Sequence, residues 1–209
     1  MPRFSLEHYE LDRVPGETDE DYAARRAMFE NLGPAGDGAS SELDEDDRFE
    51  ILDGVRLPLE EPTENHEQIL MNVFAALKPA MDLTGCRTYV RMAVRRDDIP
   101  ACELRPDILV RRGPIGDRTY IDDPIVVIEV MSSQSKRRDE RLKHPIYWNM
   151  PTVRHIVLVD AERVAVVHDR QMEEGWDRSM LSDPKAVIDL AVVGFSITLE
   201  SVYSGVAFG

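Results

Sequence analysis

The stretch PIVVIEVMSS, Pro124 to Ser133, decides the fold class, and it places a single carboxylate, Glu129, inside an otherwise apolar run. The run is short, rich in β-branched residues and bounded by proline and serine, which is typical of a strand covered on both faces. Glu129 is therefore expected to be buried. Burying an ionised carboxylate costs several kcal/mol unless a partner or a metal takes up the charge, so Glu129 requires an explanation.

Length and composition favour one soluble α/β domain with an appendage. The chain has 209 residues, and its two cysteines, Cys86 and Cys102, form neither a zinc-site spacing nor a disulfide framework. No apolar run approaches the roughly 18 residues that span a bilayer, and the N-terminus lacks the features of a targeting signal. We therefore expect a cytoplasmic protein without membrane association.

The net charge of −15 is concentrated near the N-terminus, because residues 1–54 hold 16 acidic residues against 5 arginines. We expect residues 1–47 to form an appendage, with a helix over Thr18 to Gly33 followed by an acidic linker, and residues 48–209 to form the main domain. The densest acidic part, Ala39 to Asp47, is either a solvated linker or a flap that competes with phosphate for a basic surface.

The pattern of the main domain predicts a mixed central sheet flanked by helices. Residues 48–59 alternate around the turn Asp53-Gly54, which predicts a hairpin, and residues 65–81 are amphipathic with a capping box at Asn65 and Gln68. Strands are expected at 87–96, 105–112, 124–131, 153–160 and 163–170, and a helix within 135–148. The tail predicts a strand, a turn at Gly194 and a short helix from Thr198.

Two neighbouring strands each carry an acid in an apolar context, Asp107 and Glu129. Their spacing allows one strand, a loop and a second strand lying alongside the first. Two adjacent carboxylates repel each other unless a cation lies between them, and oxygen ligands suit Mg²⁺ or Mn²⁺. The alternative is that each acid is a structural partner of an arginine, with Arg91, Arg95 and Arg105 as candidates.

The segment after Glu129 adds a lysine. Asp139, Lys143 and Tyr147 follow one another at four-residue intervals, which would align them on one face of a helix. Pro145 lies between the last two, and a proline inside a helix costs about 3 kcal/mol, so it would kink the helix or shift its start.

These pieces, in this order, resemble the Uma-two family of restriction endonucleases, part of the PD-(D/E)XK nuclease superfamily. The resemblance rests on RFEILDG (48–54), the helix with His66, RPDILV (105–110), IEVMS (128–132) and Asp139-x-x-x-Lys143-x-x-x-Tyr147, and it covers roughly residues 48–169. It implies a restriction endonuclease-like core and Mg²⁺-dependent hydrolysis of phosphodiester bonds in DNA, with Mn²⁺ as a substitute.

The resemblance also implies roles for individual residues. Asp107 and Glu129 would hold the cation together with the backbone carbonyl of Val130, and Lys143 would orient or deprotonate the attacking water. Further auxiliary candidates are His66, Glu67, Ser132, Asp139 and Tyr147. The superfamily's usual lysine, two residues after the glutamate, is replaced here by Met131, so Lys143 is expected to substitute for it, with Lys136 as the rival.

Three functions remain open at the level of sequence. The first is a DNA endonuclease, which could act as a homodimer to cut two strands. The second is a catalytically impaired relative that binds nucleic acid or a partner protein in the same cleft. The third is a scaffold in which arginines hold the two acids.

Overall fold

The computed structural model describes Asp19, Ala23 and residues 49–52, 55–96, 102–132 and 139–208. Asp19 and Ala23 are helical, and the rest of the predicted N-terminal helix lies outside the described residues, as do the acidic linker, the Asp53-Gly54 turn and Lys136.

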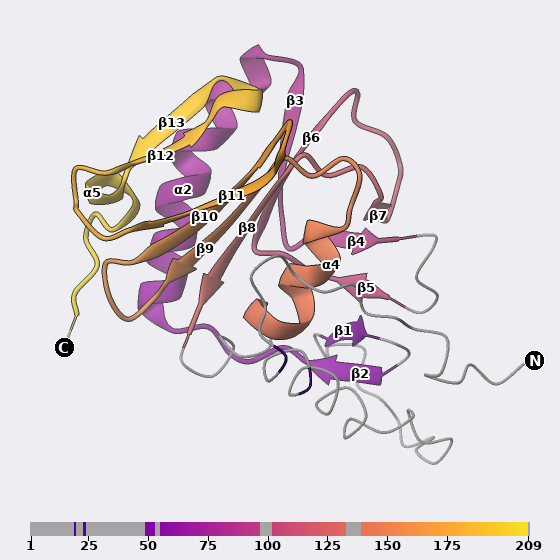
Figure 1. Ribbon diagram of the computed structural model, residues 1–209, viewed down its shortest axis with the longest axis horizontal. Helices are drawn as coiled ribbons and strands as arrows, with labels where there is room; N and C mark the ends of the chain where they lie inside the picture. The colour runs from indigo at the N-terminus through magenta and orange to yellow at the C-terminus, as the bar shows by residue number, and fades with distance from the viewer. Residues whose placement is uncertain are drawn as a thin grey trace, which may run out of the picture.

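The centre of the fold is a six-stranded mixed sheet (Figure 1). Its strand order is β11-β10-β9-β8-β6-β3; β8 and β9 are parallel, and the other pairs are antiparallel. The strands are β3 (Cys86–Val90), β6 (Ile108–Arg112), β8 (Val126–Met131), β9 (His155–Asp160), β10 (Val166–Met172) and β11 (Gly175–Leu181). The expected mixed sheet is thus confirmed, whereas β11 was not predicted from the sequence.

Strands β6 and β8 lie side by side, as the spacing of their acids predicted. Ile108 is opposite Ile128 and Val110 is opposite Val126, so the register continues to place Asp107 beside Glu129. Every residue of β8 is buried. The expectation of a strand covered on both faces is therefore correct, and the Glu129 side chain lies in the interior.

A smaller five-stranded sheet packs beside the main one, in the lower right of Figure 1, with the order β2-β1-β5-β4-β7. Its strands are β1 (Phe49–Leu52), β2 (Val55–Pro58), β4 (Ala93–Arg95), β5 (Glu103–Leu104) and β7 (Tyr120–Ile121). The predicted hairpin is present as β1 and β2, paired antiparallel.

The single strand predicted over residues 87–96 is wrong. The chain forms β3 in the six-stranded sheet and β4 in the five-stranded sheet, with a break at Arg91 and Met92. Arg91 has a φ of 51°, which is incompatible with a continuous strand. The alternating side chains continue through the break, so the sequence pattern does not reveal it.

Helix α2 (Glu64–Leu83) covers one face of the six-stranded sheet and contacts β3, β6 and β8. Its N-cap is Thr63, whose hydroxyl accepts the His66 N–H at 3.2 Å, so the capping box predicted at Asn65 and Gln68 is wrong. The buried stripe of the helix consists of Ile69, Leu70, Val73, Leu77 and Met81. In the part of the chain that the structure describes, no helix is long and apolar enough to cross a membrane.

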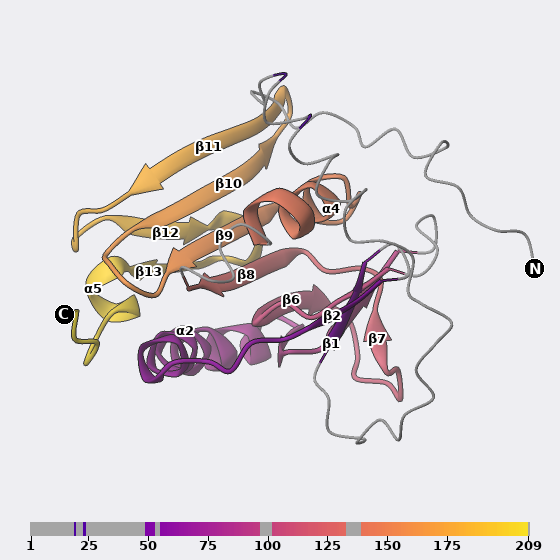
Figure 2. The same ribbon diagram turned by 90° about the horizontal axis from the view of Figure 1, so that it is seen from below.

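The opposite face of the sheet is covered by helix α4 (His144–Trp148) and the five-stranded sheet. Figure 2 shows α2 and α4 on opposite sides of β8. A π-helical turn, η2 (Asp139–Lys143), leads into α4, and Pro145 lies in the first turn of α4. Proline is tolerated there because the first N–H groups of a helix have no partner within the helix. The predicted helix over 135–148 is thus a π turn followed by a short α-helix.

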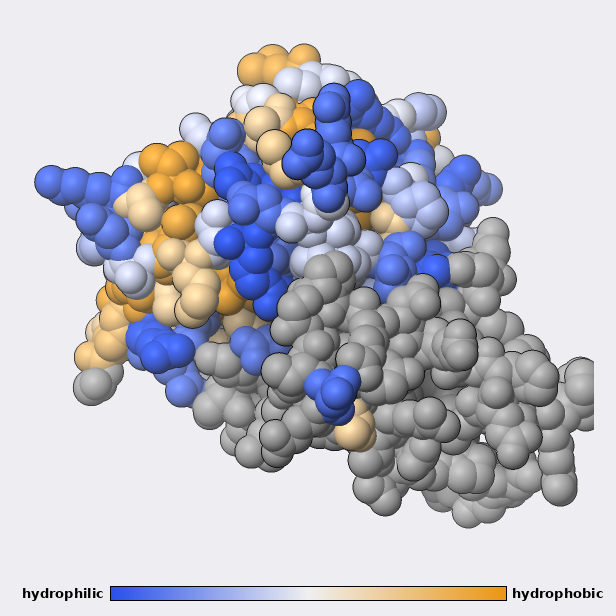
Figure 3. Space-filling model, in the orientation of Figure 1, coloured by the Kyte–Doolittle hydropathy of each residue, from blue (hydrophilic) through white to orange (hydrophobic). Residues whose placement is uncertain are grey.

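Residues 187–202 pack against the hydrophobic cluster that contains the buried face of α2. A two-stranded sheet, β12 (Val187–Leu190) and β13 (Phe195–Thr198), is joined by the 3₁₀ turn η3 (Ala191–Val193) and followed by α5 (Leu199–Val202). Gly194 has a φ of 65°, and the Thr198 hydroxyl caps α5, as the sequence predicted. Figure 3 shows hydrophobic residues at the surface on the left of the molecule. Among the described residues, Met172, Met180, Val187 and Phe208 are exposed.

A buried histidine pair joins the neighbouring strands β9 and β10. His155 Nδ1 lies 2.9 Å from His168 Nε2, so one ring donates to the other. Burial, with His168 and Arg170 nearby, lowers the pKa of His155 to about 4. Burial and Arg170 likewise lower the pKa of His168 to about 4, although neighbouring aspartates oppose the shift.

This pair predicts a loss of stability in mild acid. Both pKa values lie below the ordinary 6.5, so the unfolded chain binds more protons between pH 6.5 and 4, and stability falls as the pH drops through that range. From pH 7 to pH 5 the free energy of unfolding should fall by on the order of 2 kcal/mol per imidazole. Urea unfolding measures it; His168→Gln should show a smaller decline, and an equal decline in both proteins would refute the assignment.

Candidate active site

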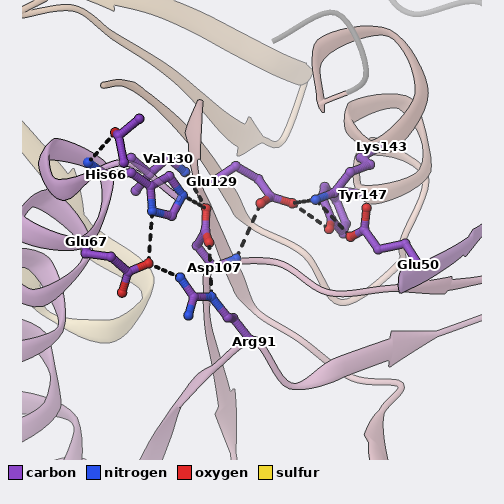
Figure 4. Close-up of polar contacts among 10 residues, drawn as sticks. Glu50, His66, Glu67, Arg91, Asp107, Glu129, Val130, Lys143 and Tyr147 are labelled. Carbon is purple, nitrogen blue, oxygen red and sulfur yellow. Dashed lines mark hydrogen bonds and ion pairs between the residues drawn. The ribbon is translucent and has the colours of Figure 1, made fainter. Parts of the chain in front are cut away.

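Asp107 and Glu129 lie at the end of the β6–β8 pairing, and each carboxylate accepts a hydrogen bond from a backbone N–H of the other segment. The Asp107 N–H donates to Glu129 Oε2 at 3.3 Å, and the Val130 N–H donates to Asp107 Oδ2 at 2.8 Å. Asp107 directly precedes β6, so the two side chains continue the hydrogen-bond ladder beyond the last backbone pair. This exchange fixes both carboxylates in place (Figure 4).

Lys143 and Tyr147 approach Glu129 from the opposite side. Lys143 Nζ lies 2.6 Å from Glu129 Oε1, and the Tyr147 hydroxyl donates to the same oxygen at 2.8 Å. Lys143 comes from the end of η2 and Tyr147 from α4, so the turn around Pro145 still delivers both side chains to one point. The predicted single helix face is replaced by a π turn and a short α-helix, but Lys143 and Tyr147 both reach Glu129, and both are almost completely buried.

A third carboxylate, Glu50 on β1, completes this side of the cluster. Its Oε1 lies 3.0 Å from Lys143 Nζ and accepts the Arg105 N–H at 2.7 Å, and Glu50 is only 1% exposed. The Lys143 ammonium is therefore held between Glu50 and Glu129. Glu50 belongs to the RFEILDG motif, but the sequence alone gives it no role, because its burial alongside Leu52 is visible only in the folded β1.

His66, on the first turn of α2, reaches Asp107. His66 Nε2 lies 3.2 Å from Asp107 Oδ2. Burial opposes ionisation of Asp107, but the hydrogen bond and charge of His66, the Val130 N–H and Lys143 outweigh it and lower the pKa of Asp107. Burial likewise opposes a charge on His66, but Asp107 and Glu67 raise the pKa of His66. Asp107 is thus a carboxylate at neutral pH.

Glu67 and Arg91 form the outer edge of the cluster. His66 Nδ1 lies 3.3 Å from Glu67 Oε1, Arg91 Nη2 donates to the same oxygen, and Arg91 Nε lies 3.8 Å from Asp107 Oδ1. The side chains of Arg91 and Glu67 are 31% and 40% exposed, whereas those of Glu129 and Lys143 are nearly inaccessible. The cluster therefore opens to solvent at Arg91 and Glu67.

The structure brings together most of the residues proposed from the sequence, and the remaining candidates stay predictions. Seven candidates lie in one cluster: Asp107, Glu129, Val130, Lys143, Tyr147, His66 and Glu67. Ser132 is half-buried just after β8, and the side chain of Asp139 is outside the described part. Arg105, considered as a partner of the two acids, donates from its guanidinium to Glu103 instead.

The donor set fits a hard divalent cation by its chemistry. Asp107 and Glu129 offer buried carboxylate oxygens, and Mg²⁺ is often bound by one or two carboxylates together with substrate phosphates and water. Within the described residues, no group of three or more His, Cys, Asp or Glu side chains is arranged so that it could hold a metal ion.

A mixed central sheet flanked by helices, with Asp107 and Glu129 at the end of the β6–β8 pairing and Lys143 beside Glu129, is the arrangement expected of a restriction endonuclease-like fold. A model of the Uma2 family, described as "Putative restriction endonuclease", matches residues 39–200. The chain belongs to this family, which confirms the resemblance recognised from the sequence motifs.

The comparison with solved structures agrees on the fold. A crystal structure described as "a putative nuclease belonging to DUF820" from Anabaena variabilis superimposes with a TM-score of 0.64. The match covers 78% of this chain and 93% of that chain, at 14% sequence identity, so the likeness concerns the fold alone. A search of curated proteins gave no match.

Proposed function

We propose that this protein is a metal-dependent endonuclease that hydrolyses phosphodiester bonds of DNA at the Asp107–Glu129 site. The observation that carries the proposal is the buried cluster in which Glu129 accepts the Asp107 N–H on one side and pairs with the Lys143 ammonium on the other, beside an ionised Asp107. Membership of the Uma2 family and the nuclease-like fold support the same reaction class.

In this proposal Asp107 and Glu129 bind Mg²⁺, or Mn²⁺ as a substitute, and the backbone carbonyl of Val130 is a third protein ligand. When bound, the cation neutralises charge on the phosphate and lowers the pKa of a coordinated water. The Lys143 ammonium, which is buried between Glu129 and Glu50, positions Glu129 and adds positive charge behind the cation site. Tyr147 orients Glu129, and His66 orients Asp107 through the hydrogen bonds described above.

A second candidate function is a binding module without catalysis. It is favoured by one observation: Glu129 already accepts hydrogen bonds from Tyr147 and from the Asp107 N–H while it pairs with Lys143. In that case the chain itself supplies the cation for Glu129. Nucleic acid would then bind at the same site without being cut.

Cleavage assays separate the two functions. Purified protein should nick or linearise plasmid DNA in Mg²⁺ or Mn²⁺ and leave it intact in EDTA; single-stranded DNA and RNA in parallel assays define the substrate. Glu129→Gln keeps the shape and the Tyr147 contact but removes the carboxylate charge, so it should lose on the order of a hundredfold in rate. DNA binding without any metal-dependent cleavage would favour the binding module.

A further inference from the structure

Arg91 is held in an unusual backbone conformation at the exposed edge of the site. Its φ is 51°, in the left-handed region. Among the described residues, no other residue except glycine has a positive φ. A side chain with a Cβ is disfavoured there, and such residues concentrate at functional sites. The Arg91 N–H donates to the Asp107 carbonyl at 3.1 Å, which ties this conformation to the strand end that carries Asp107.

The backbone conformation directs the Arg91 guanidinium toward Asp107 and Glu67 (Figure 4). Arg91 Nε is 3.8 Å from Asp107 Oδ1, which is too far for a hydrogen bond. The direct contact of the guanidinium is the ion pair with the partly exposed Glu67. A guanidinium has five N–H donors in a planar fork, and these contacts engage only part of them. Arg91 therefore retains donors that face solvent beside the carboxylates.

We infer that Arg91 forms an anion subsite that binds a backbone phosphate of the nucleic acid next to the Asp107 carboxylate. The inference rests on the proposed nuclease function and adds a residue that contacts the substrate. A guanidinium can donate two parallel hydrogen bonds to the two non-bridging oxygens of a phosphodiester. When no substrate is bound, Glu67 accepts from the guanidinium instead. A phosphate that arrives replaces Glu67 as the partner of Arg91.

The alternative is that the Arg91–Glu67 ion pair has only a structural role and stabilises the packing of α2 against the end of β3. The two roles predict opposite results for Glu67. A structural ion pair is lost when either residue is replaced, so both substitutions would then weaken DNA binding. A phosphate-binding arginine becomes more available when Glu67 loses its charge.

The test measures the binding of a short fluorescein-labelled DNA duplex by fluorescence anisotropy at several salt concentrations. The buffer contains calcium, and a gel checks that the DNA stays intact. Arg91→Gly suits the test because glycine accepts the positive φ, so thermal stability should equal or exceed that of the wild type. Its DNA affinity should fall about tenfold, and the slope of log K against log salt should decrease by about one. Glu67→Gln should bind DNA more tightly than the wild type.

Arg163→Ala is the matched control, because Arg163 is an exposed arginine paired with Asp160 at the β9–β10 turn. It should leave affinity and salt slope unchanged. Wild-type affinity and slope in Arg91→Gly would overturn the inference, as would a weakening in both Arg91→Gly and Glu67→Gln. If the wild type neither binds nor cuts DNA, single-stranded DNA or RNA, the proposed function itself fails, and the subsite fails with it.

Discussion

Asp107→Asn should reduce metal-dependent DNA cleavage by on the order of a hundred- to a thousandfold, because it removes one of the two carboxylates proposed to bind the cation. Asparagine keeps an oxygen that can accept from the Val130 N–H, so the local structure should persist. Initial rates of plasmid cleavage in Mg²⁺, with the thermal midpoint measured on the same samples, check this result.

Asp123→Asn is the control for that variant. Asp123 is also an aspartate whose pKa is lowered, but by its hydrogen bond and ion pair with Arg111 rather than by the site residues. Its substitution should leave the cleavage rate unchanged. Equal losses in the two variants would indicate a general effect of removing an ion-paired aspartate and would refute the catalytic role of Asp107.

Lys143→Met should destabilise the protein by about 3–5 kcal/mol, because it removes the ammonium that lies between two buried carboxylates. Lys143 is 3% exposed, and both Glu50 and Glu129 lie within 3.0 Å of its Nζ. Methionine matches the length of the lysine stem, so packing changes little while the charge is lost. Urea unfolding in EDTA measures the difference.

Two further variants separate charge from packing in that result. Lys78→Met removes an exposed lysine paired with Asp82 on α2 and should change stability by no more than about 0.5 kcal/mol. Adding Glu50→Gln to Lys143→Met removes one uncompensated charge and should recover part of the lost stability. If the double variant is less stable than Lys143→Met alone, charge compensation is not the role of Lys143.

The acids of the site could be predicted from the sequence because each interrupts an apolar strand. Asp107 and Glu129 stand out on that ground, and their spacing leaves room for two neighbouring antiparallel strands, as observed for β6 and β8, although the segment between them also contains the short strand β7. The segment with Lys143 and Tyr147 was found from its four-residue spacing. Pro145 changed the type of helix but did not separate the two side chains.

Other parts of the fold depend on tertiary contacts that one sequence does not reveal. The alternation of residues 87–96 continues through Arg91, although the backbone there leaves one sheet for another. Glu50 looks like an exposed acid in a hairpin until β1 packs against the segment with Lys143. Strand β11 is an edge strand with mostly exposed side chains, so it lacks the apolar run that marks a strand.

The central claim is that Asp107 and Glu129 together bind a divalent cation for hydrolysis. Titration calorimetry with Mn²⁺ on metal-free protein tests it most directly, with Asp107→Asn and Glu129→Gln as variants and Asp123→Asn as the control. We predict saturable binding to the wild type and to Asp123→Asn, and loss of that binding in both site variants. Binding that persists unchanged in Asp107→Asn and Glu129→Gln, or that is absent from the wild type, would contradict the account.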